Sequence, residues 1–195
     1  MRNFLSLLVT SLALVAAVQS VPAQAQAAQT AACPAVLNHK FNSLTTDQPV
    51  PLCNYSGKVV LVVNTASSCG YTYQYEGLEK VYKRYKDKGL VVIGFPSNDF
   101  GQQEAGNNKQ IAAFCKENYG VSFPMFEKLT TPIPQNAFYK ELIAASGQAP
   151  KWNFHKYLID KNGKVIGAFA SGVEPESAEM RRAIEKALAG TVAAR

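Results

Sequence analysis

The chain has 195 residues, a net charge of +6 at neutral pH and 47% hydrophobic residues, which suits one globular domain with a sizeable core. Its basic side chains are dispersed, and those within residues 76–88 are interspersed with acidic ones, so we expect a solvated helix face and no binding of nucleic acid. The histidines, His39 and His155, are isolated, and no cluster has the ligand spacing of a zinc site. We therefore expect neither a metal nor a cofactor.

The N-terminus has the pattern of a secretory signal peptide. Arg2 is followed by an uncharged apolar run over residues 4–18 and by small residues that end in an A-x-A pattern at Ala25. The run is shorter than the roughly 20 residues of a membrane span. We predict a signal peptide over residues 1–25, no integral membrane span after cleavage, and a periplasmic or secreted protein.

Other interpretations of the N-terminus stay open. The A-x-A pattern recurs at Ala27, the segment could remain as an uncleaved anchor, and a lipid-anchored Cys33 is a weaker alternative because no large apolar residue precedes it in the expected place. After cleavage at the first site, we expect a linker over residues 26–34 and one domain over residues 35–190.

The first half of the domain predicts a parallel strand-helix-strand unit. Residues 58–64 form a β-branched run typical of a strand buried on both faces, and residues 90–95 form a second one. Between them, apolar residues from Leu78 to Tyr85 recur at helical spacing, and Gly89 ends the predicted helix. The connection is expected to be a right-handed crossover.

The second half predicts two helices, a hairpin and a last helix. A long polar loop leads into a helix with Ile111, Phe114 and Cys115 on one face. The further expected elements are an extended segment over residues 122–126, a helix over 136–145, a hairpin of 154–159 with 165–169, and a helix from near Pro175 to just before Gly190. This order is typical of a thioredoxin-like α/β domain, with a central mixed sheet flanked by helices. The segment from Cys33 to Cys53 precedes it as an N-terminal extension, expected to be a hairpin.

Cys69 follows the first buried strand and precedes its helix by a few residues. This is the carboxyl end of the sheet, where α/β folds place their sites, and backbone N–H groups and the helix dipole there favour a thiolate. The alternative is a buried, inert cysteine. Ala66 and Thr72 stand three residues before and after Cys69, so there is no Cys-x-x-Cys motif and dithiol exchange of the thioredoxin type is disfavoured.

Three separated motifs carry a family resemblance. They are Asn64-Thr-Ala-Ser-Ser-Cys-Gly70, Phe95-Pro-Ser-Asn-Asp-Phe-Gly-Gln-Gln-Glu-Ala-Gly106 and Trp152-Asn-Phe154. In this order they resemble the motifs of the glutathione peroxidases. The resemblance implies that Cys69 is the peroxidatic nucleophile and that Gln103, Trp152 and Asn153 complete a catalytic tetrad.

The sequence departs from the family pattern in two ways. Ser97, Asp99 and Ala105 stand where many members carry other residues, and Ala105 could loosen the loop that aims Gln103. The segment between Phe126 and Trp152 is short, resembling members that lack a subunit-contact loop. We therefore expect a monomer with an open site that admits bulky hydroperoxides.

The tetrad suits peroxide chemistry. Cleavage of an O–O bond by a thiolate needs donors that hold the anion and stabilise charge on the leaving oxygen. Gln103 and Asn153 offer amide donors, and Trp152 offers an indole N–H. Without the resemblance, a core aromatic is the favoured interpretation of Trp152 and a solvated loop residue that of Gln103; the resemblance reverses this preference.

Attack by Cys69 would leave a sulfenic acid, which condenses with a second thiol. Cys115 resembles the resolving cysteine of members that are recycled by thioredoxin-like proteins instead of glutathione. The alternative is a small core residue, because Cys115 shares an apolar helix face. If Cys115 is buried, its helix must open, since a disulfide needs Cα atoms within about 7 Å.

Four cysteines allow three pairings. In an exported protein, a structural disulfide between Cys33 and Cys53 fits both position and compartment. It leaves Cys69 and Cys115 as the redox pair.

The leading hypothesis is a thiol peroxidase that reduces hydrogen peroxide and organic or lipid hydroperoxides to water and alcohols. Its reductant is expected to be a thioredoxin-like protein or glutathione. A peroxide sensor that passes a disulfide to a partner protein is the alternative, since the same chemistry serves both. A non-catalytic binding domain is disfavoured by the intact tetrad.

Overall fold

The structure is a computed structural model that describes residues 33–192, all within one compact unit. The expected signal peptide over residues 1–25 and all but the end of the linker over 26–34 lie outside the described residues.

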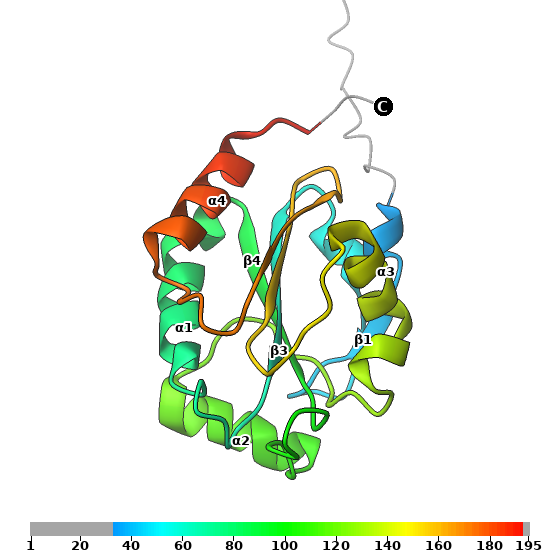
Figure 1. The fold of residues 1–195 in the computed structure, drawn as a ribbon, viewed down its shortest axis with the longest axis vertical. Coiled ribbons are helices and arrows are strands. Elements are labelled where there is room, and N and C mark those ends of the chain that lie inside the picture. Colours follow the sequence, from blue (N-terminus) through cyan, green and yellow to red (C-terminus); the bar gives the residue numbers. More distant parts are fainter. Residues whose placement is uncertain (1–32, 193–195) are drawn as a thin grey trace, which may run out of the picture. The chain divides into compact units, whose positions relative to one another are not determined.

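A four-stranded mixed sheet forms the centre of the domain, in the strand order β4-β3-β5-β6 (Figure 1). β3 pairs in parallel with β4 and antiparallel with β5, and β5 pairs antiparallel with β6. The four strands are β3 (Val59–Thr65), β4 (Leu90–Pro96), β5 (Lys156–Ile159) and β6 (Val165–Phe169). Every residue of β3 and β4 is buried, which explains their continuous apolar composition.

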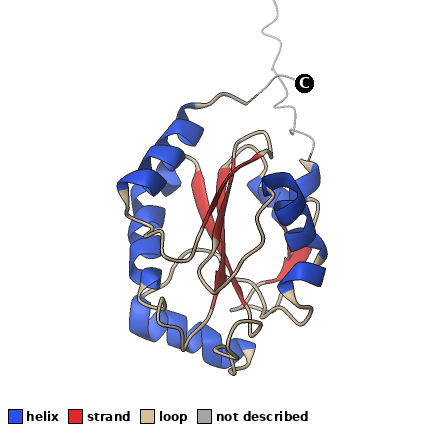
Figure 2. Ribbon diagram, in the orientation of Figure 1, coloured by secondary structure: helices blue, strands red, loops and turns tan. Residues whose placement is uncertain are grey.

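Helices cover both faces of this sheet (Figure 2). The odd-numbered residues of β3, from Val59 to Val63, pack in one core with side chains of α1, α2 and α4. The even-numbered ones, Val60 and Val62, pack in a second core with α3. The four helices are α1 (Gln74–Tyr85), α2 (Asn108–Tyr119), α3 (Ala137–Ser146) and α4 (Ala178–Ala189). The predicted thioredoxin-like fold, with its mixed sheet between helices, is confirmed.

Capping residues determine where the helices begin. Asn107 and Gln110 form a capping box at the start of α2, and Ser177 accepts a hydrogen bond from the Met180 N–H at the start of α4. The last helix therefore begins at Ala178, three residues after the predicted start at Pro175.

Two predicted strand segments differ in detail. β5 begins at Lys156 instead of 154, because Phe154 has a φ of 63° and leaves the extended conformation. Residues 122–126 form two isolated bridges, one of Phe126 with Ser43 and one of Met125 with Gly94, instead of a strand. A Cβ on Gly94 would clash with the Met125 sulfur, so this close approach requires glycine.

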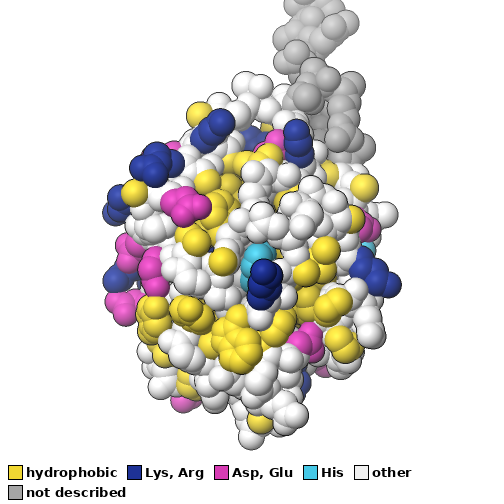
Figure 3. All heavy atoms as spheres, in the orientation of Figure 1, with side chains coloured by type: hydrophobic (Ala, Val, Ile, Leu, Met, Phe, Trp, Pro, Cys, Tyr) yellow, Lys and Arg dark blue, Asp and Glu magenta, His cyan; other side chains and the backbone are white. Residues whose placement is uncertain are grey.

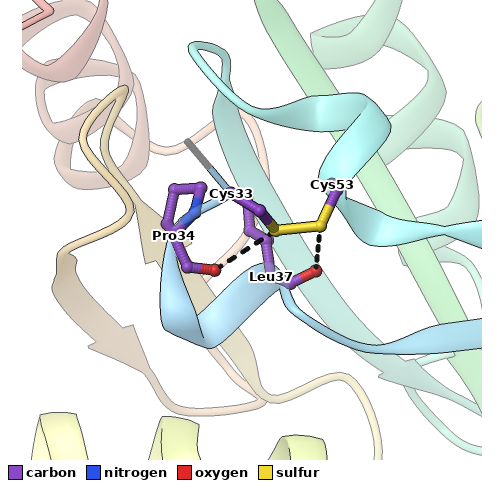
Figure 4. The surroundings of a disulfide bond; sticks show 4 residues. All are labelled: Cys33, Pro34, Leu37 and Cys53. Carbon is purple, nitrogen blue, oxygen red and sulfur yellow. Dashed lines mark hydrogen bonds between the residues drawn. A yellow bond between two sulfur atoms is a disulfide. The ribbon is translucent and has the colours of Figure 1, made fainter. Parts of the chain in front are cut away.

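The N-terminal extension contains the expected hairpin, made of β1 (Lys40–Asn42) and β2 (Pro49–Pro51). Short 3₁₀ helices, η1 (Ala35–Leu37) and η2 (Leu52–Tyr55), flank it. Cys33 and Cys53 form a disulfide with a Cα–Cα distance of 5.3 Å (Figure 4). The contacts drawn there join each sulfur to a carbonyl oxygen, of Pro34 and Leu37, at 3.5 Å. Both sulfurs belong to the disulfide and carry no proton, so they do not donate hydrogen bonds to these carbonyls. The covalent bond between Cys33 and Cys53 therefore holds the start of the described chain to η2.

Among the helices formed by residues 33–192, none is both long and apolar enough to cross a membrane.

Candidate active site

Cys69 lies in a helical turn that connects β3 with α1. A series of backbone hydrogen bonds from Thr72 N–H to Cys69 O onward runs into the helix. The Cys69 Sγ accepts a hydrogen bond from the Tyr71 N–H at 3.4 Å. The sulfur thus takes the place of an N-cap acceptor at the start of the turn, as expected from its position after the strand.

Thr72 fixes the shape of this turn. The Cys69 N–H donates to Thr72 Oγ1 at 2.9 Å, and the same hydroxyl donates to Ala66 O at 3.0 Å. All three residues are buried, so these bonds are shielded from water. No role for Thr72 was predicted from the sequence; its hydroxyl, three positions after the cysteine, was the available signal.

Gln103 lies in the loop between β4 and α2, and its backbone meets the cysteine turn. The Ser68 N–H donates to Gln103 O at 3.1 Å. Gly101 and Gln102, just before it, have φ values of 66° and 53°. The two left-handed residues bend the loop back, so that Gln103 reaches the segment that carries Cys69.

Asn64 holds the third motif beside β3. Its side chain donates from Nδ2 to Trp152 O at 3.1 Å, and its backbone carbonyl accepts the Phe154 N–H at 2.7 Å. These two bonds span Asn153 and maintain the left-handed conformation of Phe154. Asn64 in β3, the strand that leads to Cys69, therefore holds the segment of Trp152 and Asn153 in place.

The side chains of Gln103 and Asn153 contact each other. Asn153 is fully buried and donates from Nδ2 to Phe100 O at 3.3 Å and to Gln103 Oε1 at 3.1 Å. The Phe100 carbonyl can only accept, which fixes the orientation of the Asn153 amide and, in turn, that of Gln103. The Gln103 Nε2 therefore faces away from Asn153, and no described residue accepts a hydrogen bond from it.

This arrangement leaves Asn153 without a spare donor in the structure. Both Nδ2 hydrogens of Asn153 have protein acceptors, so the amide has no donor left for a peroxide. Asn153 orients Gln103 instead, and the half-buried Gln103 keeps the free donor.

Trp152 is 38% exposed, and its ring lies 6.1 Å from that of Phe100. A Cβ on Gly101 would come within 3.1 Å of the Trp152 ring, so the loop passes close under the indole. Its partial exposure disfavours the alternative of a core aromatic. Among the described residues, none accepts a hydrogen bond from the indole N–H.

Cys115 lies on α2 and is 2% exposed, in the same core as Cys69, which is 9% exposed. Both thiols are free, so no bond joins them in this structure. Burial raises the pKa of Cys115 to about 11, and the nearby carboxyl of Glu104 adds to the rise. Tyr75, which has no well-aligned hydrogen-bond partner among the described residues, lies close enough to lower that pKa partly.

A cavity of about 820 Å³ opens beside Trp152. Its wall includes the side chain of Tyr71, whose N–H contacts the Cys69 sulfur, and the ring of His155. Burial lowers the pKa of His155 to about 4, so this ring is neutral at physiological pH. In the view of Figure 3, hydrophobic side chains gather below a histidine and a lysine or arginine. The other lining residues are Gly147, Gln148, Ala149, Lys151, Ala170, Ser171 and Gly172.

Residues 33–192 contain no group of three or more His, Cys, Asp or Glu side chains that could hold a metal ion.

Comparison with known proteins places the chain in a family. The model of the glutathione peroxidase family matches residues 38–142, which include Cys69, Gln103 and Cys115. A glutathione peroxidase of Lactococcus lactis is 50% identical over 147 residues, covering 72% of this chain and 92% of that protein. The chain belongs to the glutathione peroxidase family. It is therefore a peroxidase, an oxidoreductase that acts on peroxides.

Other relatives of this peroxidase carry more specific names. A glutathione peroxidase-like peroxiredoxin of Schizosaccharomyces pombe is 47% identical, over 73% of this chain and 96% of the relative. A hydroperoxy fatty acid reductase of Synechocystis is 45% identical, over 72% of this chain and 88% of the relative.

Solved structures support the same fold for the peroxidase. The crystal structure of Trgpx in apo form covers 81% of this chain and 97% of its own, with 37% identity and a TM-score of 0.65. A thioredoxin-family thiol:disulfide interchange protein from Chlorobium tepidum covers 77% of this chain and 92% of its own. At 17% identity and a TM-score of 0.57, it shows the shared thioredoxin-like fold alone.

Proposed function

We propose that this peroxidase reduces hydrogen peroxide and organic hydroperoxides through Cys69, with Cys115 as the resolving thiol. The observation that carries the proposal is the link between the Cys69 turn and the loop of Gln103. The Ser68 N–H binds Gln103 O, and the Asn153 amide turns the Gln103 Nε2 outward. A thiol and an unused amide donor thus belong to two segments that are hydrogen-bonded to each other.

In the first step, the Cys69 thiolate attacks one peroxide oxygen and the O–O bond breaks. The leaving oxygen takes a proton and departs as water or an alcohol, while Cys69 becomes a sulfenic acid. The Tyr71 N–H stabilises the thiolate before attack. The donors suited to the leaving oxygen are the Gln103 amide and the Trp152 indole, because neither has an acceptor among the described residues.

In the second step, Cys115 displaces the hydroxyl of the sulfenic acid, which leaves as water and gives a Cys69–Cys115 disulfide. Cys115 starts buried with a raised pKa, so α2 must open before the thiol reacts. A cavity of about 350 Å³ lies against α2, with Cys115 among its lining residues. Fewer side chains therefore pack against this part of the helix, which makes its opening easier.

A dithiol protein of the thioredoxin type is the proposed reductant. Two thiols exchange for the disulfide without a cofactor, and the peroxiredoxin name of the Schizosaccharomyces pombe relative is consistent with this route. We also propose that the mature protein is exported and acts as a monomer. Export is supported by the N-terminal pattern and by the Cys33–Cys53 disulfide, since such bonds persist in oxidising compartments.

The cavity beside Trp152 is the proposed place for the organic part of a hydroperoxide. Tyr71 connects it with the site, because its backbone N–H contacts Cys69 and its side chain lines the cavity. A volume of about 820 Å³ lies within the range of small-molecule sites. The name of the Synechocystis relative is consistent with a fatty-acid hydroperoxide as substrate.

The proposal is tested with two cysteine variants. Cys69→Ser is expected to be folded and to consume no peroxide, and retained activity would overturn the assignment. Cys115→Ser is expected to consume one equivalent of peroxide and then stop in the presence of thioredoxin and its reductase. Undiminished turnover would make Cys115 a core residue only. Formation of a mixed disulfide with a client protein, without steady turnover, would instead support a peroxide sensor.

A further inference from the structure

Glu104 has a buried carboxyl group that reaches from the Gln103 loop to the segment that carries Cys69. It follows Gln103 directly, yet its side chain points inward and is 1% exposed. The roles proposed above for the tetrad and for Cys115 leave Glu104 unused. A carboxyl group in such a place is costly unless it is hydrogen-bonded or neutral.

Its contacts tie the Gln103 loop to the cysteine turn. The Ser67 hydroxyl donates to Glu104 Oε2 at 3.1 Å, beside the hydrogen bond of 3.1 Å from Ser68 N–H to Gln103 O. The Glu104 backbone is held as well, because its N–H donates to Asn98 Oδ1 at 2.8 Å and its carbonyl accepts from Lys128 Nζ at 3.3 Å. The side-chain bond is the one that depends on the charge of Glu104.

That charge changes near neutral pH. Burial raises the pKa of Glu104 to about 7, while the hydrogen bonds from Ser67 and the charge of Lys128 oppose the rise. The other titratable groups influenced by this carboxylate are Tyr75 and Cys115, whose pKa values it raises. Among these neighbours, Lys128 alone carries a positive charge.

We propose that Glu104 is a positioning residue that holds Gln103 against the Cys69 turn in its ionised form and loosens it when protonated. The proposal rests on the peroxidase role of Cys69 and Gln103. As a carboxylate, Glu104 accepts a charge-assisted hydrogen bond from Ser67. As a neutral acid it is a weaker acceptor for the Ser67 hydroxyl, so this link loses its charge assistance. The loop then aims the Gln103 amide less well, and the reaction with peroxide slows.

The test separates this effect from the ionisation of Cys69 itself. The rate constant of Cys69 with hydrogen peroxide is divided, at each pH, by its alkylation rate constant with iodoacetamide. Both reactions need the thiolate, so its fraction cancels, but only peroxide needs the donor of Gln103. In the wild type, this ratio is expected to fall about tenfold from pH 8 to pH 6, as a group with a pKa of about 7 is protonated.

Glu104→Gln removes the titration and keeps a similar shape, so its ratio is expected to be flat across this range. Glu117→Gln, which changes an exposed carboxyl in α2, is the matched control and should keep the wild-type profile. A flat ratio in the wild type, or the same fall in Glu104→Gln, would overturn the proposal.

Variants of Ser67 provide an independent test of the link to Glu104. Ser67→Ala is expected to lower the ratio about tenfold at pH 8, the size of a lost hydrogen bond to a charged group, and Ser67→Thr should restore it. An unchanged ratio in Ser67→Ala would contradict the link. If Cys69 is alkylated but does not react with peroxide at any pH, the proposed function itself fails, which is a different outcome from a flat ratio.

Discussion

Asn153 Nδ2 lies 3.1 Å from Gln103 Oε1, and the second hydrogen of that amide reaches Phe100 O. In the proposed mechanism, Asn153 therefore acts on the peroxide through Gln103, since both of its own donors are used within the protein. Because Asn153 is fully buried and Gln103 is half-buried, the pair links the protein interior to the site surface. The orientation of one amide then decides whether a donor or an acceptor faces the substrate.

Replacing Asn153 with aspartate should reverse that orientation. In Asn153→Asp a carboxylate would face the oxygens of Gln103 and Phe100, and the Gln103 amide would turn to donate to it. We expect the rate of Cys69 oxidation to fall about 100-fold, as for loss of a donor to a developing anion. Stopped-flow fluorescence of Trp152, the only tryptophan, measures this rate.

The control for this prediction is Asn38→Asp, at an exposed position in the N-terminal extension, which should react as the wild type does. Circular dichroism checks that both variants are folded. A folded Asn153→Asp protein that reacts at the wild-type rate would contradict the positioning role.

The order of strands and helices was predictable because each has a strong local signal. The β-branched run of β3 and the 3.6-residue spacing in α1 are readable in the sequence alone. The start of α4 was predicted three residues early. Proline at the first position and serine at the N-cap are both common at the start of a helix, and the sequence alone did not decide between Pro175 and Ser177.

The contacts within the site were not predictable, because they join segments far apart in the chain. Asn153 and Gln103 are 50 residues apart, and the pairing of their amides depends on how the two loops pack. The sequence indicated that Asn153 has donors but not that both are used. The hydroxyl of Thr72 and the inward side chain of Glu104 are likewise results of tertiary packing.

The capping box of α2 provides a test of helix opening. Asn107→Ala removes a cap worth about 1 kcal/mol, which makes local opening about fivefold easier. If α2 must open to release Cys115, the Cys69–Cys115 disulfide should form about fivefold faster after peroxide addition. The formation of the sulfenic acid should be unchanged. Quenching with acid and mapping the disulfide by mass spectrometry follows this step.

Ser177→Ala is the matched control for the helix test, since it removes a similar cap from α4, which carries neither redox cysteine. It should lower the global stability by a similar amount without accelerating disulfide formation. Equal rates in both variants and the wild type would mean that opening of the first turn of α2 does not limit the resolving step.

Gly172 tests the cavity beside Trp152. An added Cβ there would have only Tyr71 Oη near it, at 3.7 Å, so a side chain fits but occupies the cavity. Gly172→Leu is expected to lower kcat/KM for linoleic acid hydroperoxide about tenfold, the effect of excluding roughly two methylene groups. Hydrogen peroxide should react as before. Ala113→Leu, exposed on α2, is the control, and an equal loss for both peroxides would contradict the assignment.

The Cys33–Cys53 disulfide should stabilise the fold without taking part in turnover. It closes a loop with a sequence separation of 20, for which loop entropy in the unfolded chain gives about 3 kcal/mol. The double variant Cys33→Ser/Cys53→Ser should lose stability of that order in urea unfolding and keep its peroxidase activity at low temperature. Lost activity in a folded variant would show that the N-terminal extension contributes to the site.

Lys156 provides a prediction about stability and pH. It is fully buried at the start of β5 and donates to Gln74 Oε1, Ser171 O and Val173 O, and burial lowers its pKa to about 7. The unfolded chain holds this proton up to a pKa of about 10.5, so between pH 7 and pH 9 it binds more protons than the folded chain. The free energy of unfolding should therefore rise with pH over this window, by up to about 1.4 kcal/mol per pH unit from this group. The stability contributed by the neutral amine is lost as the pH falls through 7.

Lys156→Met removes the titration, and subtracting its unfolding free energy from that of the wild type cancels the groups the two proteins share. A difference that does not change between pH 7 and pH 9 would mean that Lys156 stays protonated, held as an ammonium by its three acceptors.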